Sequence, residues 1–459
     1  MPPRLEFINT PIPLLIRRLA IPTSVGFFFN TMFNVVDTIY AGQISTLAQA
    51  GLAISFPVFF IILSVGMGIG TGTTALIANA LGRRNLQKAR MFARQAITFG
   101  FLLSLLLSVV GYLVVPYLFR FMNATGEYLQ LALDYMNVIL ISTVTFLLNG
   151  ILNGILSSRG DARSYRNVLV VGSILNIGFD PLLLFGWGPF PAMGIQGIAL
   201  STVLIQAAGL IYMGYRVSRT ELFIRIRPRY FIPRKEYFKE IAQQGFPASL
   251  NMMTVAIGIF IITWFISGYG NDTVAAYGIA TRIEQIALLP TIGLNIAVLA
   301  IVGQNFGAGH YERVHEAYRK SLKYGAIIMG AGMVWVFLLS DLLMKFFTVD
   351  PPVIGIGATY LKIAVMMFYS YVLLNVSVAA LQGMKKPMFA VWIGLFRQVV
   401  MPITLFGIFS WVMKLELTAI WWGLVAINWT AAIFAVIYVT KKLRKIPLVA
   451  SQASDTEKL

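Results

Sequence analysis

Two aspartates, Asp37 and Asp180, stand inside long apolar stretches of this 459-residue chain. A carboxylate within the hydrocarbon part of a membrane costs about 2.5–3.5 kcal/mol on insertion scales. Acids in such places are rare, and they mark ion pathways and proton relays. The chemistry that these two residues predict is the reversible uptake of a proton or of a small hard cation such as sodium.

Amide side chains accompany both acids. Asn176 lies four residues before Asp180, on the same face of a helix. Asn34 precedes Asp37 by three residues, and Asn30 precedes it by seven. Carboxylate and amide oxygens together predict a polar pocket that suits either ion. The alternative is that these side chains only hold neighbouring helices together.

Prolines interrupt the same two stretches. Pro181 follows Asp180 directly and has no N–H, so the carbonyl of Ile177 should lose its helical partner. Pro22 lies 15 residues before Asp37 and permits a kink in the first stretch. A first helix that flexes at Pro22 would couple ion uptake at Asp37 to a change of shape.

The elements that must position these residues are membrane-spanning helices. The chain is 58% hydrophobic and only 12% charged, with a mean hydropathy of +0.77, whereas soluble proteins are nearer 45–50% and about 25%. Helices are expected because open strands cannot satisfy their backbone in lipid. Twelve apolar runs are long enough to span a membrane, near residues 14–41, 48–80, 92–119, 129–157, 165–186, 193–215, 239–268, 273–304, 321–347, 354–382, 388–412 and 417–440.

Lys and Arg are unevenly distributed among the loops. Thirty of the 36 lie at the two termini and in the loops after the second, fourth, sixth, eighth and tenth runs, against four in the opposite loops. Since cytoplasmic loops carry the excess of Lys and Arg, we expect both termini in the cytoplasm. The same distribution explains the net charge of +18, so we expect no nucleic-acid partner.

The two halves of the chain resemble one another. Ordered matches at offsets of 221 to 227 residues pair Pro22 with Pro247, Gly51 with Gly278, Gly100 with Gly325, and Pro181 with Pro402. We therefore predict a six-helix lobe at 1–217, a basic cytoplasmic linker and hinge at 218–238, a second six-helix lobe at 239–441 and a cytoplasmic tail at 442–459. Six spans are an even number, so a pseudo-twofold axis along the membrane normal should relate the lobes around a cavity.

Other charged residues carry weaker signals. Arg282 and Glu284 are two residues apart in one run and so do not share a helical face. For both, and for Arg397, we expect a structural partner in preference to transport chemistry. His310 and His315 fall in a predicted cytoplasmic loop, where we expect them to be solvated. The chain has no cysteine, and we find no phosphate-binding loop or nucleophilic triad.

These residues resemble the multidrug and toxic compound extrusion (MATE) family, and in particular its bacterial DinF-type branch. The resemblance covers nearly the whole chain and is carried by Pro22, Asn34-Val-Val-Asp37, Ala41-Gly42, Asn176-x3-Asp180-Pro181 and Gly303-Gln-Asn-Phe-Gly-Ala-Gly309. It implies an all-α integral membrane protein of two six-helix lobes with a V-shaped central cavity. It also implies export of drug-like, often cationic compounds in exchange for protons or sodium.

Residue by residue, the resemblance places the coupling acid of the branch on Asp37. Its fifth-span partners fall on Asn176 and Asp180, its fourth-span asparagine on Asn153, and its sixth-span threonine on Thr202. Phe33 stands where some relatives carry tyrosine, which puts a hydroxyl contact to the pocket in doubt. The seventh and tenth runs lack the carboxylates of a sodium-coupled branch, which disfavours sodium in the second lobe.

We expect a proton-coupled multidrug efflux antiporter rather than an enzyme, located in a bacterial plasma (inner) membrane as a monomer. Its expected partners are small drug-like substrates and the lipid bilayer, with no cofactor. The expected coupling ion is the proton, and sodium at Asp37, Asn176 and Asp180 stays open. Two alternatives are a flippase for lipid-linked precursors, which would want a cationic cavity, and a membrane-embedded enzyme, for which we find no convergent catalytic set.

Overall fold

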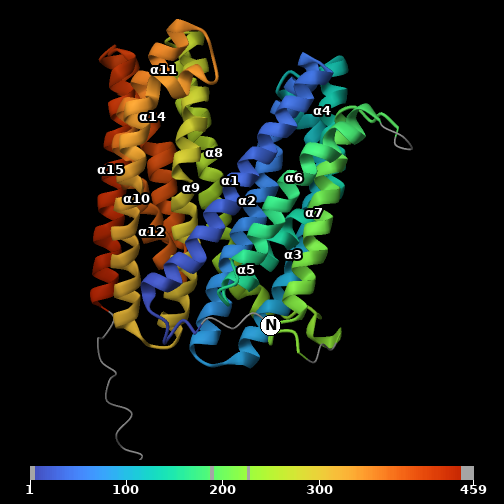
Figure 1. The fold of residues 1–459 in the computed structure, drawn as a ribbon, viewed down its shortest axis with the longest axis vertical. Coiled ribbons are helices and arrows are strands. Elements are labelled where there is room, and N and C mark those ends of the chain that lie inside the picture. The colour runs from blue at the N-terminus through green and yellow to red at the C-terminus, as the bar shows by residue number, and fades with distance from the viewer. Residues whose placement is uncertain (1–5, 187–190, 225–227, 446–459) are drawn as a thin grey trace, which may run out of the picture. The chain divides into compact units, whose positions relative to one another are not determined.

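A computed structural model describes residues 6–186, 191–224 and 228–445 (Figure 1). Within these ranges the regular structure is helical. The first half holds α1 (Ile12–Ile44), α2 (Thr46–Gly82), α3 (Leu86–Phe121), α4 (Gly126–Ile141), α5 (Thr143–Ser157), α6 (Arg163–Phe185) and α7 (Ile195–Ser218). A short 3-10 helix, η1 (Pro228–Tyr230), lies in the segment that leads to the second half.

The second half begins with three long helices, α8 (Lys235–Ser267), α9 (Asn271–Gly307) and α10 (Tyr311–Lys345). The next span consists of α11 (Pro351–Ala364), the 3-10 turn η2 (Val365–Met367) and α12 (Phe368–Gly383). The following span alternates α-helical and π-helical segments, α13 (Met388–Leu395), η3 (Phe396–Val400), α14 (Met401–Gly407) and η4 (Ile408–Val412), before α15 (Leu417–Arg444).

The expected twelve spans are confirmed by length and composition: eleven continuous stretches qualify in the described chain, and α4 with α5 makes a twelfth. That fourth span, expected as an apolar run at 129–157, bends by 49° at Ser142. Hydroxyl groups stabilise the bend. Thr143 Oγ1 donates to the carbonyl of Leu140, and Thr145 Oγ1 donates to that of Ser142, both at 2.8 Å. Ser and Thr side chains that satisfy backbone carbonyls in this way bend helices.

The two halves repeat their helix lengths. α1 and α8 have 33 residues each, α2 and α9 have 37 each, and α3 and α10 have 36 and 35. α1 and α8 both continue as helices through an internal proline, Pro22 and Pro247 respectively. The repeat seen in sequence is therefore also a repeat of elements.

The described chain forms two compact units. The first comprises residues 25–77 and 85–250, and the second comprises 6–24, 78–84 and 251–445. The boundaries fall inside α1, α2 and α8 and in the loop between α2 and α3. The expected boundaries at 217 and 239 lie near the end of α7 and the start of α8. Of the expected tail at 442–459, residues 446–459 lie outside the described part of the chain.

Helix α2 packs through glycines within the first unit. A methyl group on Gly70 would lie 2.3 Å from the carbonyl oxygen of Gly150 on α5, and one on Gly154 would lie 2.3 Å from the oxygen of Gly70. Thr74 Oγ1 adds a hydrogen bond across this contact, to the carbonyl of Gly154 at 3.0 Å. Small residues spaced four apart let membrane helices approach this closely.

The segment after α7, expected to be a hinge, is fastened to α3. Gln95 Nε2 donates to the carbonyls of Tyr230 and Ile232 at 2.8 and 2.9 Å, and Gln95 Oε1 accepts from the backbone N–H of Arg234 at 2.9 Å. Arg94 Nη2 donates to the carbonyl of Ile224 at 3.2 Å. Polar side chains of α3 thus bind the backbone of this segment along its described length.

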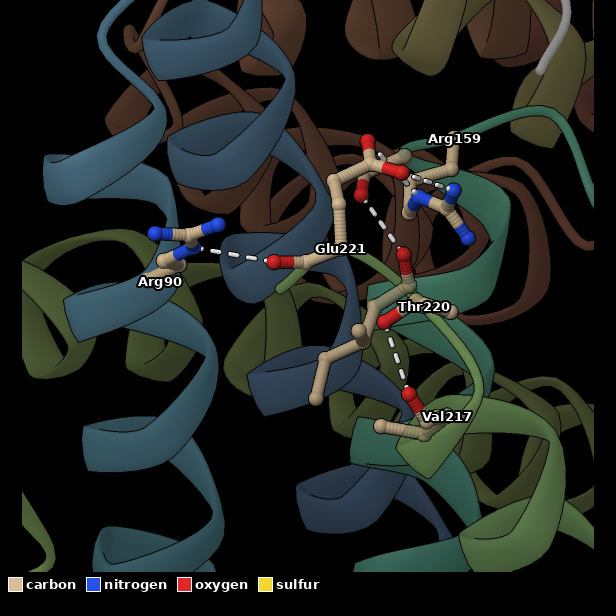
Figure 2. Close-up of polar contacts among 7 residues, drawn as sticks. Arg90, Arg159, Val217, Thr220 and Glu221 are labelled. Atoms are coloured by element: carbon tan, nitrogen blue, oxygen red, sulfur yellow. Dashed lines mark hydrogen bonds and ion pairs between the residues drawn. The ribbon is translucent and has the colours of Figure 1, made fainter. Parts of the chain in front are cut away.

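Two arginines bind the start of the same segment at Glu221 (Figure 2). Arg90 of α3 donates from Nε to the Glu221 carbonyl at 2.9 Å. Arg159, which follows α5, forms an ion pair with the Glu221 carboxylate, to which Nε donates at 3.3 Å. One residue of the segment therefore ties α3 to the end of α5.

Candidate functional site

Asn176 joins the two aspartates inside the first unit. Its Nδ2 donates to Oδ1 of Asp37 and to Oδ1 of Asp180, both at 2.9 Å. Asn176 and Asp180 lie one turn apart on α6, whereas Asp37 comes from α1. The exposed fraction is 6% for Asp37 and 0% for Asn176 and Asp180. Two carboxyl groups therefore share one amide donor in the interior of the unit.

Three further side chains surround the acids. The hydroxyl of Thr202, which the resemblance indicated, interacts with the Asp37 carboxyl and also donates to the carbonyl of Ile198 at 3.1 Å. Its neighbour Ser201 lies beside Asp180, and the buried Tyr135 of α4 lies near both acids. Sequence reasoning missed Ser201 and Tyr135, since neither has a polar partner at helical spacing that would have marked it.

Two buried oxygen atoms of the site have no donor among the described residues, Asn176 Oδ1 and Asp180 Oδ2. A buried acceptor without a partner costs about 1–3 kcal/mol. A proton on a carboxyl group would add an O–H donor, and a sodium ion would bind both kinds of oxygen directly. The donor set thus fits the uptake of one small positive ion.

The carbonyl of Ile177 was expected to lose its helical partner, and in the structure a side chain of another helix donates to it. Pro181 does remove its helical partner, but Tyr40 Oη donates to this carbonyl at 3.2 Å. Tyr40 lies three residues after Asp37 on α1, so it ties α1 to α6 beside the acids. The sequence could have indicated Tyr40, because it lies one helical turn after Asp37.

The structure does not bring every predicted amide to the acids. Asn34 is exposed, and its Nδ2 donates to the backbone carbonyl of Asn30 at 2.9 Å. Neither of these two forms a hydrogen bond with a carboxyl group of the site in the described structure. Asn153 is half-buried and accepts from Ser157 Oγ at 3.1 Å. These predicted pocket residues lie outside the hydrogen-bonded cluster, so Asn176 is its central amide.

The two kink prolines lie within helices that continue past them. Pro22 is internal to α1 and Pro181 is internal to α6. After Pro22, the hydroxyls of Thr23 and Ser24 donate to the carbonyls four residues earlier, at 2.8 and 2.9 Å. Back-bonding hydroxyls next to a proline weaken the local helix, so this is the part of α1 where we expect bending to cost least.

A second buried polar cluster lies in the second unit. Glu284 of α9 is 5% exposed and accepts from Tyr360 Oη at 2.7 Å. Arg397, in the π-helical segment η3, donates from Nη1 to Asn428 Oδ1 at 2.8 Å and lies over the ring of Tyr371. A structural partner was expected for Glu284 and for Arg397, and the structure shows Tyr360 and Asn428 in these roles. Arg282 instead is exposed.

The histidines differ from one another. His310 is exposed, as expected for a solvated residue. The expectation for His315 was wrong, because this residue is half-buried and its Nε2 is buried without a hydrogen-bond partner in the described structure. Its position on α10, packed against the bundle, explains the difference. No group of three His, Cys, Asp or Glu that could hold a metal occurs among the described residues.

The MatE family profile matches the chain twice, at residues 22–182 and 247–406. The chain therefore belongs to the MatE family, and the double match agrees with the internal repeat. It is an all-helical, multi-pass membrane protein.

Named relatives align over most of the chain. The FAD transporter of Shewanella oneidensis is 27% identical over 413 residues, which cover 90% of this chain and 91% of that protein. The probable multidrug resistance protein YoeA of Bacillus subtilis is 26% identical and covers 82% of each.

Solved structures share the fold at 26% identity. One is the outward-facing conformation of a multidrug resistance MATE family transporter of the MOP superfamily, with a TM-score of 0.90 over 96% of this chain and 98% of that one. A MOP superfamily transporter from Pyrococcus furiosus, described with a binding pocket of reverse polarity, gives the same TM-score and coverage.

Proposed function

We propose that this protein is a secondary active multidrug efflux antiporter that exports small amphipathic or cationic compounds in exchange for protons. The observation that carries the proposal is the buried cluster of Asp37, Asn176 and Asp180, in which two carboxyl groups share one donor. Relatives named as multidrug resistance and multidrug export proteins support the class of cargo. Both termini are proposed to lie in the cytoplasm of a bacterial cell.

Asp37 is proposed as the main protonation site because it connects the cluster to α1. A proton there adds a donor beside the two unpartnered oxygens, Asn176 Oδ1 and Asp180 Oδ2. It also removes one of two adjacent negative charges, which repel strongly in a medium of low dielectric constant. Protonation therefore changes how firmly α1 is held to α6.

The driving force suffices for efflux. One proton that moves down about 100 mV and one pH unit releases about 3.7 kcal/mol. At 1.4 kcal/mol per decade, this supports a gradient of about 400-fold for a neutral cargo.

Sodium is the alternative coupling ion. The carboxyl and amide oxygens of the cluster are ligands that sodium also accepts. A flux assay in which choline replaces sodium distinguishes proton coupling from sodium coupling, because choline is too large for a site of this kind. Transport that persists in choline buffer supports the proton, and transport that stops supports sodium.

The decisive experiment measures flux of a cationic dye, ethidium, into inside-out vesicles under an imposed pH gradient. We expect Asp37→Asn to lose gradient-driven uptake by at least about tenfold, since an amide cannot exchange a proton at this pH range. Asp341→Asn is the matched control, because Asp341 is 56% exposed and pairs with Lys362. Uptake by Asp37→Asn at the parent rate, with folding intact, would reject the assignment.

A second candidate cargo is FAD, because a relative aligned to 90% of this chain is named an FAD transporter. The same inside-out vesicles, with FAD supplied in the outer buffer, test it directly through FAD uptake. FAD movement that depends on the pH gradient and on Asp37, without ethidium movement, would favour the flavin nucleotide over drug-like cations.

A further inference from the structure

An apolar groove of about 340 Å³ runs between α6 and α7 in the first unit. Val168, Val171 and Leu175 line it on α6, and Ile205 and Ala208 line it on α7. Figure 1 shows these two helices side by side. The volume falls within the range of ligand pockets, about 300–1,000 Å³.

Two glycines in the lining, Gly172 and Gly209, hollow the groove. A methyl group on Gly172 would lie 2.9 Å from Cγ2 of Ile205, and one on Gly209 would lie 2.7 Å from Cγ1 of Val168. Each glycine thus opposes a branched side chain of the other helix. The helices approach closely at these points without filling the space between them.

The groove has one polar end. Asn167 and Tyr212 line it there. Arg166 donates from Nε and Nη2 to Oδ1 of Asn167, at 3.1 and 2.7 Å, which holds its guanidinium group beside the groove. Arg163 lies one turn before Asn167 on the same face of α6 and is exposed. Within the described structure, Arg163 and Arg166 form no ion pair.

The acids of the neighbouring segments do not neutralise these two arginines. Asp161 pairs with Arg216 at 2.9 Å, and the carboxylate of Glu221 pairs with Arg159 (Figure 2). The polar end of the groove therefore keeps an excess of positive charge, which is complementary to a negatively charged group.

The rest of the groove lies in membrane-spanning helices. α6 and α7 contain windows of mean hydropathy 2.0 and 1.6. Beside the groove, Ile174 is 59% exposed and Ile211 is 75% exposed, so this surface is apolar and uncovered by protein. From Asn167 to Leu175 the groove follows α6 for about 12 Å, which is most of the about 15 Å that one leaflet contributes to the hydrocarbon core.

We propose that this groove binds one acyl chain of an anionic phospholipid, whose phosphate is bound by Arg163 and Arg166. The occupant follows from charge complementarity at one end and an apolar, membrane-facing channel along the remainder. Basic pockets between transmembrane helices bind anionic headgroups in this manner. The site goes beyond the proposed transport function, and it does not depend on the coupling ion or the cargo.

The test uses phosphatidylglycerol with a photoactivatable diazirine on one acyl chain. The full-length protein is placed in phosphatidylcholine nanodiscs that contain a small share of this probe, and cross-linked peptides are mapped by mass spectrometry. We expect labelling to concentrate on peptides of α6 and α7. A phosphatidylcholine probe with the same chain should label them at least fivefold less.

Paired variants separate the two ends of the site. Ala208→Trp fills the groove and should reduce labelling at least fivefold, whereas Ile211→Trp, on the same helix outside the groove, should leave it unchanged. Arg163→Gln with Arg166→Gln should abolish the preference for phosphatidylglycerol. Arg319→Gln, an exposed cation at the start of α10, should preserve it.

Several outcomes overturn the proposal. Even labelling of all exposed helices does so, as does equal labelling by both probes in the parent protein, or labelling that Ala208→Trp leaves unchanged. If Ala208→Trp does not fold, the labelling of α6 and α7 by the two probes in the parent protein still tests the proposal.

Discussion

At the scale of single residues, the central finding is that one amide serves two carboxyl groups. Asn176 donates to both Asp37 and Asp180, although Asp37 is 139 residues away in the chain. Hydrogen bonds to charged groups contribute about 1.5–3 kcal/mol each. Asn176 is therefore the residue that sets the geometry of the two acids.

Replacement of Asn176 by alanine tests this. We expect Asn176→Ala to lower gradient-driven ethidium flux about tenfold or more, because both acids lose their common donor. Asn34→Ala is the matched control on α1, since the Asn34 amide donates only to the backbone of Asn30. Flux is measured in the same vesicles at equal protein content. Equal losses in both variants would contradict a specific role for Asn176.

The loop acid Asp161 gives a pH-dependent prediction. Burial raises the pKa of Asp161, but hydrogen bonds from Arg216 and Ser164 outweigh burial and hold the pKa below its usual range. Because the folded pKa is the lower one, the stabilisation is present above the unfolded pKa, near 3.9, and is lost as pH falls through the folded pKa.

Asp161→Asn should therefore lower the melting temperature in detergent at pH 6, by an amount that corresponds to about 1 kcal/mol. The gap between parent and variant should begin to shrink below about pH 4, where the Asp161 carboxyl of the unfolded chain becomes protonated. It should close once the pH falls below the folded pKa, where the carboxyl of the folded parent is neutral too. A gap that stays constant down to pH 3 would show that the ion pair with Arg216 does not contribute.

At the scale of elements, glycine spacing decides how closely the helices pack. Gly70 of α2 meets Gly150 and Gly154 of α5 backbone to backbone, at a distance that excludes any side chain. The same principle hollows the groove between α6 and α7, where glycines oppose branched side chains. The bend between α4 and α5 shows a different arrangement, in which threonine hydroxyls donate additional hydrogen bonds to the backbone carbonyls beside the bend.

We predict that Gly70→Ala destabilises the protein by about 1–3 kcal/mol, because the new methyl group overlaps the carbonyl of Gly150. Gly330→Ala on α10 is the control, since nothing lies within 4 Å of its added methyl group. That variant should be neutral or more stable by up to about 1 kcal/mol. Melting temperatures in detergent compare the two, and equal effects would refute the packing argument.

At the scale of the whole molecule, the chain has no cysteine, which makes its topology directly measurable. Single cysteines introduced in intact cells report sidedness without background. We expect Val349→Cys, in a loop after α10 where the side chain is 94% exposed, to react with a membrane-impermeant maleimide. Arg319→Cys should react only after the cells are permeabilised. The reverse pattern would invert the proposed orientation.

The sequence by itself determined the helical class, the twelve spans, the internal repeat and the two acids with Asn176. These features depend only on local sequence. They follow from the length of the apolar runs, from the spacing of prolines and glycines, and from the separation of four residues that puts Asn176 and Asp180 on one helical face. The two family matches and the repeated helix lengths agree with them.

Only the tertiary structure decided which side chains surround the acids. Asn34 is three residues from Asp37, yet its amide donates to the backbone carbonyl of Asn30, whereas Tyr135 of α4 and Ser201 of α7 lie near the acids. Tyr40 donates a hydrogen bond to the Ile177 carbonyl, which Pro181 leaves without its helical partner. The groove between α6 and α7 lies where Gly172 and Gly209 each face a branched side chain of the other helix. Contacts between helices far apart in the chain depend on how the helix backbones pack. The spacing of residues within one helix does not predict that packing.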